Sequence, residues 1–134
     1  MRSEKTKELS QEVVVNLVTV LISVNNWALD KTYAIHPGLS SAGLFDLNRL
    51  RALQDDEVAQ LLFVAGYSKS QFVRGLIAKR LKSLAATLEE PKLEQLCDVV
   101  KKNDSVTIRS ILRPIHGIGP VVIERFLALQ GIAS

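Results

Sequence analysis

Apolar residues recur along this chain with the three- and four-residue spacing of amphipathic helices, and no segment alternates as a surface strand does. The pattern and its capping residues predict helices over residues 10–24, 27–35, 46–53, 56–65, 68–88, 91–102, 105–113 and 120–130. His36-Pro37-Gly38 breaks the second of these, and a loop rich in Ser and Gly should follow to Gly43. We therefore expect an all-α fold, a compact multi-helix domain over residues 10–134 after a charged lead at residues 1–9.

Several single residues predict where these helices begin and end. Asp46, Asp104 and either Asp55 or Asp56 have the short acidic side chain that caps a helix N-terminus, and Ser10 and Ser68 occupy similar places. Gly66 is a helix stop, and Pro120 is suited to a first helical turn. In the 10–24 helix, apolar residues cover most of the surface, so we expect it to be buried on several sides.

Composition then narrows the class of protein. With 134 residues, 47% hydrophobic and 23% charged, the chain can bury a core. The apolar run 13–24 is too short to cross a bilayer and the start has no signal-peptide pattern, so we expect no membrane association and a cytoplasmic protein. The single Cys97 excludes an internal disulfide and reads as a buried helix thiol. His36 and His116 have no further ligand at metal spacing, so no metal site is expected.

The most informative segment is Ile115-His116-Gly117-Ile118-Gly119-Pro120, which joins the last two predicted helices. Glycine leaves backbone N–H groups uncovered, and proline begins a helix without the loss of a hydrogen bond. Such a turn can direct free amides and the positive end of a helix dipole at a phosphate. The alternative interpretation is a tight connection between two packed helices, and the six residues alone favour neither.

Charge is distributed unevenly along the chain. Between Tyr67 and Leu88 there is no acidic residue, and the basic ones are Lys69, Arg74, Lys79, Arg80 and Lys82. From Lys101 onward the basic residues are Lys101, Lys102, Arg109, Arg113 and Arg125, against Asp104 and Glu124. Charge alone is better explained by ordinary solvated helices, and the net charge of +3 is small. Together with the glycine turn, however, it favours a face that meets DNA.

The segment Leu112–Ile123 resembles the hairpin of the helix-hairpin-helix DNA glycosylases, the endonuclease III-type superfamily. The segment 62–70, with Leu76, Lys79, Arg80 and Leu81 after it, is similar to the glycine-aromatic-lysine stretch that precedes a long helix in that family. Leu21–Trp27, with Asn25 and Asn26, corresponds to its apolar helix and Asn-containing turn. The resemblance covers residues 10–131 and implies a C-terminal helix-hairpin-helix motif at residues 104–131.

The chain departs from the family where the family does its chemistry. In bifunctional members a catalytic lysine follows the second hairpin glycine by two residues, and Val121 stands there. Valine has no amine with which to form a Schiff base. The family's aspartate would fall near or beyond Ser134, and neither Asp104 nor Glu124 replaces it. Trp27, Tyr33 and Tyr67 could wall a base pocket, but core or boundary packing explains them better. We expect no catalytic residue and no glycosylase activity from this chain alone.

Three hypotheses remain open. The first is a non-catalytic module that binds the phosphates of double-stranded DNA without sequence specificity. Its contacts would be His116, Gly117, Ile118, Gly119, Pro120, Val121, Lys101, Arg109, Arg113, Lys69, Arg74 and Lys79, with no cofactor beyond a possible monovalent cation at the hairpin. It requires the amides of Gly117, Ile118 and Gly119 to be uncovered.

The second hypothesis is a protein-interaction or oligomerisation subunit. It predicts exposed apolar surface on the 13–24 helix or at Val121, Val122, Phe126 and Leu129, to be covered by a partner or a second copy. In the third, another chain supplies the missing aspartate and the assembly is a glycosylase.

Overall fold

A computed structural model of the chain describes residues 4–24 and 26–133, and the side chains of residues 7–24 and 26–133. Over this part of the chain the regular structure is entirely helical, which confirms the all-α prediction. The helices are α1 (Glu4–Ile22), α2 (Leu29–Ala34), α3 (His36–Ser41), α4 (Leu47–Ala52), α5 (Asp55–Ala65), α6 (Gln71–Thr87), α7 (Glu90–Lys101), α8 (Ser105–Leu112) and α9 (Pro120–Leu129).

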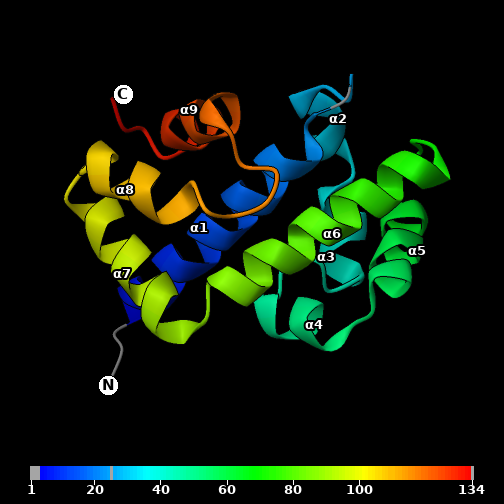
Figure 1. Ribbon diagram of the computed structural model, residues 1–134, viewed down its shortest axis with the longest axis horizontal. Coiled ribbons are helices and arrows are strands. Elements are labelled where there is room, and N and C mark those ends of the chain that lie inside the picture. The colour runs from blue at the N-terminus through cyan, green and yellow to red at the C-terminus, as the bar shows by residue number, and fades with distance from the viewer. Residues whose placement is uncertain (1–3, 25, 134) are drawn as a thin grey trace.

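Helix α1 forms the centre of the molecule. Figure 1 shows it between one group of helices, α7 to α9, and a second group, α2 to α6, and it packs directly against α2, α6, α7 and α9. Val13, Leu17 and Leu21 on this helix are completely buried, as its nearly continuous apolar surface predicts. No described helix combines the length and the apolar character needed to cross a bilayer.

The start of α1 differs from the prediction at Ser10, because the helix already begins at Glu4. The added residues include Glu4, Lys7 and Glu8, which have high helix propensity, so the charged lead continues the helix instead of preceding it. At the other end, the carbonyl of Ser23 accepts a hydrogen bond of 2.6 Å from Arg125 Nη1 on α9. This contact satisfies a helix-end carbonyl and ties α9 to α1.

The predicted loop at residues 36–43 is wrong, because α3 occupies His36–Ser41. Pro37 lies in the first turn of α3, where its missing N–H costs no helical hydrogen bond. Gly38 allows α3 to approach α5 closely, since a Cβ there would lie 2.3 Å from the Ala65 carbonyl oxygen. The Pro-Gly pair therefore starts a helix and lets it pack, where the sequence pattern indicated a break.

Most of the predicted helix ends are confirmed. The Asp46 carboxylate accepts from the amides of Asn48 and Arg49, and Gly66 ends α5 with φ +115°. Helix α5 does not use Asp55 or Asp56 as its cap, because Gln54 precedes it and donates its N–H to the Glu57 carboxylate at 2.9 Å.

Two further helix starts concern α6 and α8. Ser70, and not Ser68, caps α6, through a 3.3 Å bond from the Val73 amide. Asp104 caps α8 as predicted, and its carboxylate accepts from both the amide and the hydroxyl of Thr107. The hydroxyl bond is the main reason that the pKa of Asp104 lies below its usual value.

Candidate nucleic-acid interface

The turn between α8 and α9 is anchored by two isoleucines. Ile115 and Ile118 are buried, and the Ile118 N–H donates to the Ile115 carbonyl at 3.1 Å. His116 and Gly117 lie between them and are more exposed, and Gly117 has the left-handed φ of +87°. The apolar residues thus hold the turn in the core while its glycine reverses the chain.

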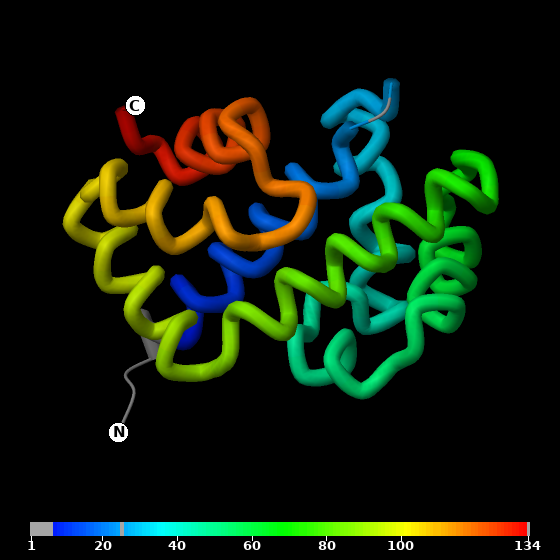
Figure 2. Tube along the Cα trace, in the orientation of Figure 1, coloured from blue at the N-terminus to red at the C-terminus, as the bar shows by residue number. Residues whose placement is uncertain are grey.

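This turn lies beside the middle of α6, as Figure 2 shows. The His116 N–H donates to Ser83 Oγ at 3.1 Å. Gly117 packs against the side chain of Arg80, where an added Cβ would lie 2.4 Å from Arg80 Cδ. Two residues of α6 therefore fix the position of the turn.

The prediction that three successive amides are uncovered is wrong at Ile118, because a reverse turn uses that N–H internally. The amides of Gly117, Gly119 and Val121 have no acceptor among the described residues. Gly119 is extended, and an added Cβ there would meet nothing within 4 Å. Pro120 takes the first position of α9, as predicted, and offers no N–H. The turn thus presents separated amides and the positive end of the ten-residue helix α9.

The basic residues predicted near the turn fall into two groups. Lys101, at the end of α7, and Arg113, just after α8, are exposed and have no partner among the described residues. Arg109 instead forms an ion pair of 2.5 Å with Glu124 on α9. This pairing occupies Arg109, so Arg109 is a weaker candidate for a phosphate contact.

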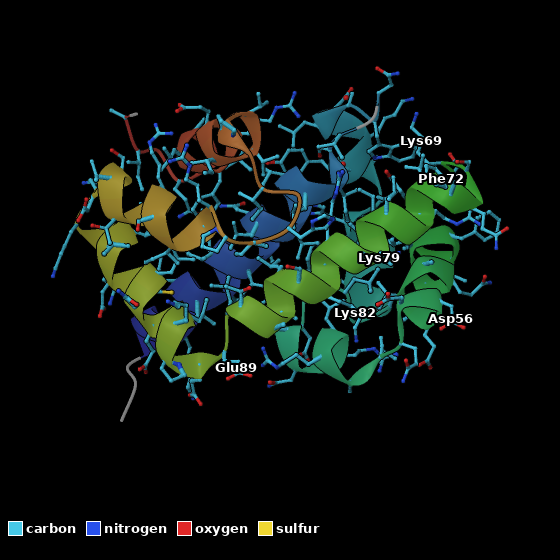
Figure 3. All side chains as sticks on the ribbon, in the orientation of Figure 1. Asp56, Lys69, Phe72, Lys79, Lys82 and Glu89 are labelled. Carbon is cyan, nitrogen blue, oxygen red and sulfur yellow. The ribbon has the colours of Figure 1, made fainter. Side chains whose placement is uncertain are left out.

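The predicted cations of α6 divide in the same way. Arg74 donates to the Lys69 carbonyl at 2.5 Å, and its guanidinium lies 4.8 Å from the centre of the Phe63 ring. Lys79 is exposed and without a described partner (Figure 3), next in sequence to the Arg80 that touches the turn. Lys69 is half-buried at the start of this region, and Figure 3 places it near the Phe72 end of α6. Lys79 is therefore the predicted α6 cation best placed to act with the turn.

Arg80 and Ser83 are not among the site residues that the sequence predicts. Their three-residue separation on a predicted helix was the available signal, because it places them on one face. The sequence did not show that the glycine turn would pack on that face.

The apolar surface expected for a partner is exposed at only one of the predicted residues. The side chains of α1 from Val13 onward are buried or half-buried, as are Val122, Phe126 and Leu129, and of the predicted set only Val121 is exposed. The apolar face of α9 packs on α1, which removes it from solvent. The large exposed apolar side chains among the described residues are Tyr33, Phe63, Val64, Phe72, Val106 and Val121.

The structure also places the remaining candidate residues that the sequence singled out. Trp27 and Tyr67 are buried, as expected, with their rings edge to face at 4.8 Å, whereas Tyr33 is 44% exposed. Asn26 has φ +64°, which suits its predicted role in a turn, whereas Asn25 lies outside the described residues. Cys97 is buried in α7, as predicted.

No known protein family, curated protein sequence or solved structure matches the chain. The relation of the α8–turn–α9 segment to the hairpin of the DNA glycosylases therefore stays a prediction.

Proposed function

We propose that this chain binds duplex DNA without catalysis, by holding backbone phosphates at the turn between α8 and α9. The observation that carries the proposal is the set of unpaired amides at Gly117, Gly119 and Val121, at the positive end of α9. Backbone amides at a helix start bind phosphate through both hydrogen bonds and the helix dipole.

The unpaired cations supply the second part of the interaction. Arg113 lies two residues before the turn in sequence, and Lys79 is next in sequence to Arg80, which contacts Gly117. Neither Lys79 nor Arg113 has a partner among the described residues. Each would neutralise a neighbouring phosphate and release its counterions, which gives an affinity that falls with salt. Because none of these groups reads a base edge, binding would be independent of sequence.

A salt titration with a duplex of arbitrary sequence tests the proposal. The dissociation constant should rise steeply with salt, and Gly119→Leu should weaken binding about tenfold or more, because the new side chain covers the amides. An added Cβ at Gly119 would meet nothing within 4 Å, so the variant should keep its helical circular dichroism. Lys92→Gln, an exposed lysine on α7, is the control and should bind as the parent does. Unchanged binding by Gly119→Leu would show that the turn is not the contact.

Oligomerisation is a second candidate function, because three large apolar side chains are exposed near the end of α5 and the start of α6. Phe63, Val64 and Phe72 are 53%, 69% and 75% exposed. Isolated apolar residues are normal on a surface, but a group of large ones favours burial by another chain. The solution mass at micromolar concentration, with and without Phe72→Ser, tests this candidate. A monomer under both conditions contradicts it.

A further inference from the structure

We propose that Arg80, together with the amide of Gly117, forms a binding site for an oxyanion of the phosphate class. This inference deepens the proposed function, and it rests on it where the oxyanion is a DNA phosphate. The same chemistry would also bind a free phosphate ion.

Arg80 differs from the other arginines that the structure describes. Five of them donate to an identified acceptor: Arg49 to Ala42, Arg51 to Ala85, Arg74 to Lys69, Arg109 to Glu124 and Arg125 to Ser23. Arg113 is exposed and has no partner among the described residues. Arg80 is half-buried, yet it has no described hydrogen bond or ion pair, and its Nε is both buried and unpaired. A partly desolvated guanidinium without an acceptor is costly, which indicates that an anion completes it.

The other unpaired buried polar atoms lie in the same cluster. Among the described side chains these atoms are Trp27 Nε1, Tyr67 Oη and Arg80 Nε. Trp27 and Tyr67 are in ring contact at 4.8 Å, and Arg80 packs against Gly117 of the turn. Tyr67 is completely buried, and the positive charge of Arg80 acts on its hydroxyl, which has no described partner. Trp27, Tyr67, Arg80 and Gly117 therefore link the interior to the turn.

The chemistry of this cluster specifies the charge of its ligand. The indole N–H, the guanidinium and the amide of Gly117 can only donate, and a phenol can donate as well. Burial raises the pKa of Tyr67 to about 12, although the charge of Arg80 opposes this rise, so the phenol is protonated at neutral pH. The one cationic member of this set, Arg80, favours an acceptor that carries negative charge. A guanidinium fork matches the paired oxygens of a phosphate better than a single-atom anion.

Inorganic phosphate and a short duplex are the two probes. Calorimetric titration of the full chain with phosphate should show binding, and in Arg80→Met the affinity should fall about tenfold or more, because charge-assisted bonds are lost. Arg80→Lys keeps the charge but not the guanidinium fork, so its phosphate affinity should lie between those of the parent and Arg80→Met. Lys92→Met, at an exposed lysine on α7 outside the proposed interface, is the control and should bind phosphate as the parent does. Amide NMR of the unmodified chain adds a readout that needs no variant: the resonances of Gly117 and Gly119 should shift as phosphate is added.

The outcomes separate the site from the proposed function. Loss of phosphate binding in Arg80→Met, with no duplex binding by the parent, supports the site for free phosphate and removes the DNA proposal. Duplex binding that Arg80→Met leaves unchanged, with no phosphate effect on Gly117, overturns the site and leaves the DNA proposal standing. If Arg80→Met does not fold, an absence of shifts at Gly117 in the parent overturns the site just as directly.

Discussion

The backbone N–H of His116 donates to the hydroxyl of Ser83 at 3.1 Å, across 33 residues of sequence. The bond joins the turn after α8 to the middle of α6. Three residues before Ser83 on the same helix, the side chain of Arg80 packs on Gly117, the residue that follows His116. A side chain on a long helix thus sets where the unpaired amides of the turn point.

Ser83→Ala should loosen the turn without unfolding the domain. One hydrogen bond at a half-exposed site contributes about 1 kcal/mol or less to the free energy of unfolding. Duplex affinity should nevertheless fall, because the amides of Gly117 and Gly119 lose their fixed orientation. Urea unfolding and the salt titration measure the two quantities separately. Equal affinity in parent and variant would mean that the bond does not orient the contact.

Lys79 and Lys82 form a matched pair on α6. Lys82 Nζ donates to the carbonyls of Leu50 and Arg51 at 3.2 and 3.5 Å and also to that of Leu53, and so completes the end of α4. Lys82→Met should therefore lower the free energy of unfolding by about 1–2 kcal/mol. Lys79→Met should change it by less than about 0.5 kcal/mol, because Lys79 is exposed and has no partner among the described residues.

For DNA binding, the two variants should have the opposite order of effect. Lys79→Met should reduce the slope of log affinity against log salt by about one phosphate contact. Lys82→Met should leave that slope unchanged, since its ammonium already serves α4. Identical slopes for the parent and Lys79→Met would remove Lys79 from the proposed interface.

The two glycines of the turn should respond differently to alanine. Gly117 has φ +87°, and an added Cβ would meet Arg80, so Gly117→Ala should lower the free energy of unfolding by about 1–2 kcal/mol or more. Gly119 has φ −103° and open space, so Gly119→Ala should change it by less than about 0.5 kcal/mol. Thermal and urea unfolding of both variants check this order. A larger loss at Gly119 would contradict the geometry of the turn.

His36 should make stability depend on pH in mildly acidic solution. Its Nε2 lies 2.9 Å from the Thr19 hydroxyl, and burial lowers its pKa below 6.5. The unfolded chain therefore takes up a proton at His36 before the folded chain does, so stability is greatest above pH 6.5 and falls as the pH drops toward the folded pKa.

NMR titration of the His36 ring should give a midpoint below 6.5 in the folded protein. As the pH falls below 6.5, the free energy of unfolding of His36→Gln should decline less than that of the parent. A midpoint at or above 6.5 would contradict the burial of the ring.

Local signals along the chain suffice to predict most of the helices. Asp46, Gly66, Asp104 and Pro120 act on backbone groups within a few residues of themselves, so their effects can be read without the fold. The failure at Pro37-Gly38 has the opposite cause, because Gly38 is required by the approach of Ala65, which lies on another helix.

Only the packing of the folded chain determines which basic side chains remain free to contact a phosphate. Lys79 and Lys82 are indistinguishable as letters in a basic stretch, and so are Arg80 and Arg74. Their differences arise from the acceptors that the described residues offer: the carbonyls at the end of α4 for Lys82, the Lys69 carbonyl for Arg74, and none for Arg80 Nε. The hydrogen bond from the Ile118 amide to the Ile115 carbonyl likewise depends on the shape of the turn. Helix formation is governed by neighbours in sequence, whereas the partner of a charged side chain is whichever acceptor the folded chain brings within reach.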